Sequence, residues 1–129
     1  MGAMILLVDD EPAFRLATRL YLEGKGYEVT EAEDGMAAMK LLASDPLPDG
    51  VILDINMPRV SGIDVLSFLH STERTRNIPV VMLTARDDAE TETLSWYEGC
   101  DWYQVKSKPI EYEDLGLVIE RLLQYKNPQ

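Results

Sequence analysis

The sequence predicts an α/β fold, a three-layer sandwich with helices on both faces of a five-stranded parallel β-sheet. Short apolar runs recur along the chain, each uninterrupted and bounded by turn residues, which is typical of strands buried on both faces. These runs alternate with helix-like segments throughout the chain, and such alternation favours a parallel sheet.

The elements follow one another in a regular order. We expect strands at residues 4–8, 28–32, 51–54, 80–84 and 102–105, and helices at residues 12–25, 35–44, 62–71, 88–98 and 111–125. Pro12 suits the first turn of a helix, and Gly24 suits its end. Asp34 precedes the second helix, and the turn at Pro46 closes it before the third strand.

The first helix has two different faces. Side chains expected to pack on the sheet are Phe14, Ala17, Thr18 and Tyr21. Leu16 and Leu20 are spaced i and i+4 on nearly the opposite side. Single exposed leucines are common, so covering the surface is one interpretation of this pair and a docking surface is the other.

Length and composition limit the classes of protein to which the chain can belong. Its 129 residues suit one domain, expected at 4–126, with residues 1–3 left over from expression. The apolar share of 46% and the absence of a long apolar run predict a soluble protein, not a membrane protein. A single cysteine, Cys100, favours the reducing cytoplasm. The net charge of −11 argues against direct nucleic-acid binding.

Acidic residues follow two of the expected strands. Asp9 and Asp10 come after the first strand and Asp54 ends the third, while Thr84 ends the fourth. Ligand sites of parallel sheets lie at the carboxyl ends of their strands, so these groups should meet. Clustered carboxylates repel and favour a cation such as Mg²⁺, and a carboxylate can also accept a phosphoryl group. The alternative is that Asp9 and Asp10 only cap the next helix.

The motifs resemble the receiver domain of two-component response regulators over essentially the whole chain. Residues 5–11 resemble the opening strand and acidic pair of that family, and residues 54–62 resemble its phosphoacceptor loop, D-x-x-M-P followed by glycine. Residues 79–85 resemble the strand that ends in the switch threonine, and residues 108–110 resemble the lysine–proline turn. The resemblance implies a flavodoxin-like doubly wound sheet of strand order 2-1-3-4-5.

The resemblance also implies a role for each site residue. Asp54 would accept the phosphoryl group and Asp10 would bind Mg²⁺ directly, with Asp9 assisting through water. The backbone carbonyl of Asn56 would be a further ligand, and Thr84 would bind the phosphoryl group and move inward. The resemblance thus implies a phosphoacceptor, Asp54, four cation ligands, Asp9, Asp10, Asp54 and Asn56, and two switch residues, Thr84 and Tyr103.

The lysine of the site has two candidates. The spacing usual in the family, counted from Gly99, arrives at Lys106, whereas the lysine–proline pair of this chain is Lys108 with Pro109. We expect Lys108 to take the role, because the chain after it matches the family without a gap, and Lys106 is the alternative. A two-residue bulge in the fifth strand would reconcile the two counts.

The expected partner is a histidine kinase or a histidine phosphotransfer protein, as the resemblance implies. Trp96 falls on the outward side of the fourth expected helix, with Tyr103 nearby in the sequence. We expect this face to bind an output domain or a second copy of the chain, because tryptophan is enriched at interfaces. The expected function is signalling by a receiver that promotes only its own phosphorylation and dephosphorylation, not enzymatic turnover.

Three other functions fit parts of the sequence. A Mg²⁺-dependent phosphatase of the haloacid dehalogenase type would need a second acid two residues after its nucleophile, where this chain has Asn56. A receiver-like module that is never phosphorylated would usually lack part of the acidic set. A flavin-binding protein would need a phosphate-binding loop after the first strand, which the sequence lacks.

Overall fold

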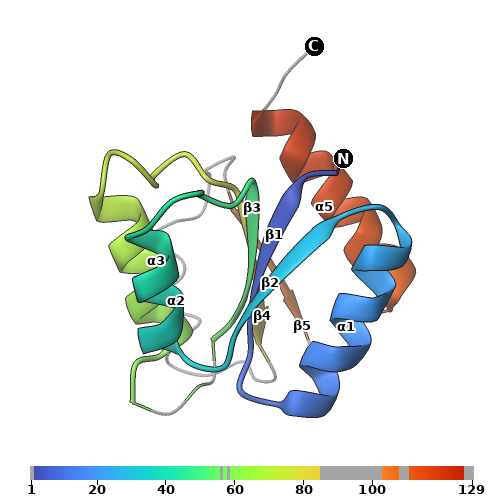
Figure 1. The fold of residues 1–129 in the computed structure, drawn as a ribbon, viewed down its shortest axis with the longest axis horizontal. Helices are drawn as coiled ribbons and strands as arrows, with labels where there is room; N and C mark the ends of the chain where they lie inside the picture. The colour runs from blue at the N-terminus through green and yellow to red at the C-terminus, as the bar shows by residue number, and fades with distance from the viewer. Residues whose placement is uncertain (1, 56, 58, 85–102, 108–110, 127–129) are drawn as a thin grey trace.

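The fold is a five-stranded parallel sheet in the order β2-β1-β3-β4-β5, with helices on both faces (Figure 1). The structure is a computed structural model, and it describes residues 2–55, 57, 59–84, 103–107 and 111–126. The predicted flavodoxin-like fold and its strand order are therefore confirmed.

The strands and helices have well-defined bounds. The strands are β1 (Met4–Val8), β2 (Glu28–Ala32), β3 (Gly50–Asp54), β4 (Val80–Thr84) and β5 (Tyr103–Ser107). The helices are α1 (Pro12–Gly24), α2 (Gly35–Leu42), α3 (Gly62–Ser71) and α5 (Tyr112–Lys126). The helix expected at 88–98 lies outside the described residues.

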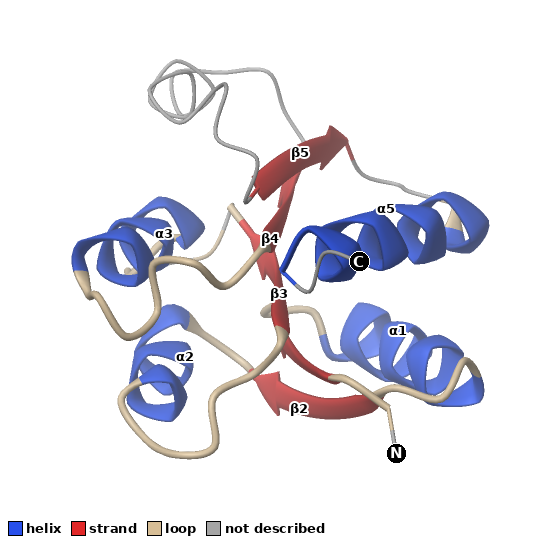
Figure 2. Ribbon diagram, turned by 90° about the horizontal axis from the view of Figure 1, so that it is seen from above, coloured by secondary structure: helices blue, strands red, loops and turns tan. Residues whose placement is uncertain are grey.

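Alternate side chains of each central strand enter two separate cores. Ile5 and Leu7 of β1 pack with α1 and α5, whereas Leu6 and Val8 pack with α2 and α3. Figure 2 shows the two pairs of helices on opposite faces of the sheet. All four side chains are at most 1% exposed, so β1 is buried on both faces, as its uninterrupted apolar sequence predicts.

The fifth strand ends two residues later than the sequence predicts. It was expected at 102–105, but the ladder with β4 pairs Leu83 with Lys106 and Thr84 with Ser107. Strand pairing is made by the backbone, so polar side chains at the edge of a sheet do not end it. The ladder runs one to one from Tyr103 to Ser107, so a bulge that would reconcile the two lysine counts does not lie within this stretch.

The predicted inner face of α1 was wrong at one position. Ala17 is exposed, whereas Leu22 is buried in the core beneath α1. The core-facing line runs from half-buried Phe14 through buried Thr18 and Leu22 at steps of four residues, and it turns away from Ala17. Leu16 and Leu20 face solvent as predicted, at 50% and 57% exposure.

Among the described residues, no helix is both long enough and apolar enough to cross a lipid bilayer.

Candidate functional site

Three aspartates lie together at the carboxyl edge of the sheet. Asp54 is the last residue of β3, and Asp9 and Asp10 directly follow β1. One carboxylate oxygen from each residue lies within 4.8 Å of the other two. Asp9 and Asp54 are 1% and 3% exposed, while Asp10 is exposed to solvent. The cluster therefore has a buried floor and one carboxylate at its mouth.

The sheet register brings these residues together. Val8 pairs with Leu53 across β1 and β3, so the residues that follow each of them reach the same edge. The Asp9 amide donates to the carbonyl of Ala32 on the other side, at 3.2 Å. Beyond Asp54, the Ile55 amide donates to the Leu83 carbonyl at 2.9 Å. Backbone bonds to neighbouring strands thus fix the chain on both sides of the cluster.

Capping does not account for the acidic pair. The residue that caps α1 is Glu11, and its side chain makes no capping hydrogen bond. The Asp9 carboxylate instead accepts the Glu11 amide at 2.9 Å, before the helix begins. In α2, by contrast, the Asp34 carboxylate accepts the Ala37 amide at 2.8 Å. The capping function is thus present elsewhere in the chain and does not explain the pair after β1.

The loop after Asp54 is held closed by its own backbone. Both the Met57 and Gly62 amides donate to the Ile55 carbonyl, at 3.1 and 3.2 Å. A β-carbon at Gly62 would lie 2.3 Å from the Asp54 carbonyl oxygen and 2.7 Å from the Ile55 α-carbon. Only glycine fits there, and that close approach lets α3 begin directly beside the acidic cluster. The sequence shows this glycine but not the steric reason for it.

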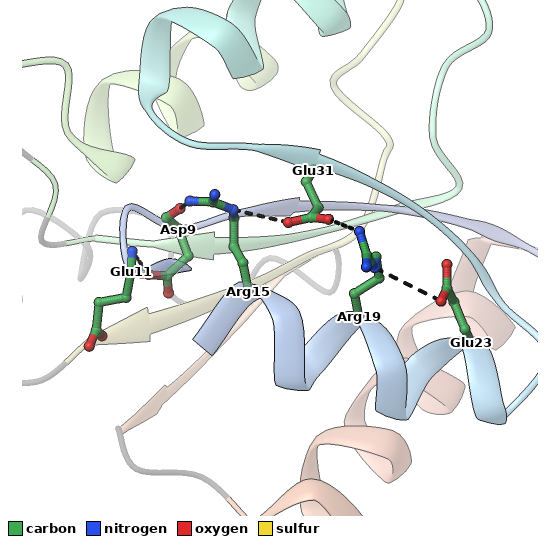
Figure 3. Close-up of polar contacts among 6 residues, drawn as sticks. All are labelled: Asp9, Glu11, Arg15, Arg19, Glu23 and Glu31. Carbon is green, nitrogen blue, oxygen red and sulfur yellow. Dashed lines mark hydrogen bonds and ion pairs between the residues drawn. The ribbon is translucent and has the colours of Figure 1, made fainter. Parts of the chain in front are cut away.

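An arginine that the sequence reasoning missed lies beside the cluster. The Arg15 guanidinium donates to the Asp9 backbone carbonyl at 2.8 Å and to the Glu31 carboxylate at 3.0 Å (Figure 3). Arg15 and Glu31 are separated by 16 residues and belong to α1 and β2. The only sequence signal is the spacing of Arg15 and Arg19, which places two cations on the same side of the helix.

Of the other residues predicted for the site, some are located through the pairing of their strands, and the rest lie outside the described residues. Thr84 ends β4, and its register partner is Ser107. Lys106 is in the row of Leu83, which is itself paired with Asp54. Tyr103 begins β5, at the opposite end of the strand from the cluster. Asn56, Trp96 and Lys108 lie outside the described residues.

The oxygen atoms of the cluster suit a Mg²⁺ ion. Mg²⁺ prefers oxygen ligands at about 2.0–2.1 Å and keeps several of its waters, so directly bound oxygens stand at most about 4 Å apart. Three carboxylate oxygens within 4.8 Å of one another could hold such an ion, in part through its waters. The like charges of the three residues also favour a cation.

Comparison with known proteins identifies close likenesses over the whole chain. A family model of the response regulator receiver domain matches residues 5–120. The response regulator MprA of Mycolicibacterium vanbaalenii is 39% identical over 99% of this chain and 53% of its own length. MprA of Mycobacterium tuberculosis is 36% identical over 100% of this chain and 54% of its own. The chain thus spans about half the length of these relatives.

Solved structures agree with the sequence matches. A receiver domain of a signal transduction histidine kinase from Syntrophus aciditrophicus has a TM-score of 0.87 and 28% identity, covering 99% of this chain and 95% of its own. The chemotaxis protein CheY4 of Vibrio cholerae has a TM-score of 0.79 and 28% identity, covering 95% of this chain and 99% of its own.

Proposed function

Since this chain belongs to the response regulator receiver domain family, whose members are the phosphoacceptors of two-component signalling, we propose that Asp54 is its phosphoacceptor. The observation that carries the proposal is the place of Asp54, which ends a central strand with its carboxylate beside those of Asp9 and Asp10. A carboxylate oxygen of Asp54 would attack phosphorus, forming a P–O bond as the P–N bond to the donor's histidine breaks.

The other residues of the site would bind Mg²⁺ and help to neutralise the charge of the phosphoryl group. Asp10 would be a direct Mg²⁺ ligand together with Asp54 and the Asn56 carbonyl, and Asp9 would assist through water. The exposure of Asp10 and the burial of Asp9 agree with this division. A bound Mg²⁺ would neutralise charge on the phosphoryl oxygens. The Thr84 hydroxyl would donate a hydrogen bond to a phosphoryl oxygen, and the Lys108 ammonium, or that of Lys106, would balance its charge.

The proposed partners follow from this chemistry. The phosphoryl donor would be a histidine kinase or a histidine phosphotransfer protein in the cytoplasm. The response would leave through Thr84 and Tyr103 to the face that carries Trp96, where an output domain or a second copy would bind. With a net charge of −11, this domain would not bind nucleic acid directly. It would act as a signalling domain and not as an enzyme on other substrates.

Incubation with Mg²⁺ and acetyl phosphate tests the proposal. Intact-mass measurement should show one added phosphoryl group, which should be absent when Mg²⁺ is chelated before acetyl phosphate is added and absent from Asp54→Asn. Asp45→Asn is the matched control: its carboxylate is exposed and follows α2, before β3 begins, so labelling should be unchanged. Equal labelling of Asp54→Asn would refute the proposal. Turnover of added phosphomonoesters would favour the phosphatase instead.

A further inference from the structure

We propose that Arg15 is a positioning residue of the cation site, fixing the turn between β1 and α1 that carries Asp9 and Asp10. This inference rests on the proposed function, because it concerns the same acidic cluster. Arg15 would not touch the cation or the phosphoryl group. It would act through the backbone of Asp9.

The Arg15 guanidinium joins α1, β2 and the turn after β1. From its place in the first turns of α1, Arg15 donates through Nη1 to the Asp9 carbonyl and through Nε to Glu31 of β2 (Figure 3). The Arg15 side chain is only 17% exposed, so its geometry is set largely by protein contacts. A planar guanidinium offers several donors in fixed directions, whereas a lysine ammonium is a single flexible point charge. The two contacts therefore need arginine.

The Asp9 carbonyl is the point at which the turn can be held. β1 ends at Val8, and the Asp9 amide is already bonded to Ala32. The Asp9 carbonyl belongs to the same rigid peptide plane as the Asp10 amide. Holding this oxygen fixes the direction in which the chain leaves for Asp10. Asp10 is exposed and lies outside the strand, so its direction depends on this plane.

A chain of ion pairs holds Arg15 in place. Glu31 accepts from Arg15 with one oxygen and from Arg19 with the other, and Arg19 also lies 3.9 Å from Glu23. Figure 3 shows these side chains in one line from Asp9 along α1. Partly exposed pairs contribute little energy singly, but together they restrict the rotamers of Arg15. Glu31 also balances the charge of Arg15, so the guanidinium does not compete with a cation for the aspartates.

The affinity for Mg²⁺ tests this role directly. Isothermal titration calorimetry on the Arg15→Gln variant should show a dissociation constant for Mg²⁺ raised about tenfold, as for other residues that orient metal ligands indirectly. Glu31→Gln should also raise the dissociation constant for Mg²⁺, but by a smaller factor, because Arg15 keeps its hydrogen bond to the Asp9 carbonyl. The rate of labelling by acetyl phosphate should return to the wild-type value at saturating Mg²⁺. A variant that merely destabilises the fold is not expected to lose affinity for Mg²⁺ and yet recover its labelling rate at saturating Mg²⁺.

Arg74 provides a matched control. Its guanidinium also joins a backbone carbonyl and a carboxylate, those of Ser44 and Asp45, but in the turn that precedes β3. The Arg74→Gln variant should keep the wild-type affinity for Mg²⁺. Circular dichroism on each variant separates loss of fold from loss of positioning.

Two results would overturn the inference. One is a folded Arg15→Gln variant whose dissociation constant stays within about twofold of wild type, the range of ordinary surface substitutions. If Arg15→Gln does not fold, an unchanged affinity in Glu31→Gln overturns it instead. Asp10→Asn separates this failure from that of the proposed function. Loss of Mg²⁺ binding in Asp10→Asn with no effect of Arg15→Gln removes Arg15 alone, whereas unchanged binding in both removes the cation site as well.

Discussion

Each aspartate of the cluster has a different surrounding, and this gives the three residues different capacities. Asp9 is tied by its amide to Ala32, by its carboxylate to Glu11 and by its carbonyl to Arg15. Asp10 is exposed at the mouth of the cluster. Asp54 is buried at the end of the central strand. Asp9 is therefore held in one orientation, Asp10 is open to solvent, and Asp54 is shielded from water.

Gly62 should not tolerate a side chain. Because a β-carbon there would lie 2.3 Å from the Asp54 carbonyl oxygen, Gly62→Ala should lower the free energy of unfolding by about 1–3 kcal/mol, as overpacking does. Chemical denaturation measures this change. Gly24→Ala is the matched control: nothing lies within 4 Å of its added β-carbon, so its stability should be unchanged or slightly raised. Equal effects of the two substitutions would contradict the steric argument.

The lysine of the site can be identified by substitution. We expect Lys108→Ala to abolish the structural response to beryllofluoride, an acyl-phosphate analogue, because the expected ammonium would no longer balance the charge of the bound group. Lys106→Ala should retain the response. Amide chemical shifts with and without beryllofluoride and Mg²⁺ provide the measurement. The opposite pattern would assign the role to Lys106, in the register row of Asp54.

Among the elements, the pattern of apolar residues predicts the bounds of strands that are set by burial. It does not predict bounds that are set by backbone pairing alone. The bounds of β1, β2, β4 and α3 agree with the sequence prediction. Apolar runs define β1 and the body of β4, whereas β2 and α3 are set off by the turn residues beside them. The bounds of β5 do not, because Lys106 and Ser107 continue its ladder despite their polar side chains. The acidic cluster was predictable from strand ends, whereas the Arg15–Glu31 contact was not, since it joins α1 to β2 through side chains alone.

The two faces of α1 should respond differently to truncation. Leu22 is 0% exposed, so Leu22→Ala should lower the free energy of unfolding by about 2–5 kcal/mol through lost burial and a cavity. Leu20 is 57% exposed, so Leu20→Ala should change it by no more than about 0.5 kcal/mol. Urea denaturation of both variants gives the comparison. A similar cost for both would mean that Leu20 is also buried, in contacts the structure does not contain.

At the scale of the whole molecule, the acidic cluster couples the ends of β1 and β3 to the loops that leave them. Both strands lie in the middle of the sheet, with a separate core on each face. A cation held by residues from both strands binds the folded chain but not the unfolded one, so it should stabilise the entire domain.

Mg²⁺ should therefore raise the unfolding temperature of the protein. At a free concentration ten times its dissociation constant, it should add about 1.4 kcal/mol to the free energy of unfolding. The Asp10→Asn variant should show much less of this gain, and chelation with EDTA should reverse it in the wild type. A thermal unfolding series in Mg²⁺ provides the test. An equal gain in Asp10→Asn would mean that the ion binds elsewhere.

The most direct test of the central claim locates the phosphoryl group chemically. Borohydride reduces an aspartyl phosphate to homoserine, which marks the modified position permanently and allows peptide mass spectrometry to find it. After reaction with acetyl phosphate and Mg²⁺, we expect homoserine at position 54 and aspartate still present at positions 9 and 10. Homoserine at either of those positions, or at none of the three in a protein that binds Mg²⁺, would contradict it.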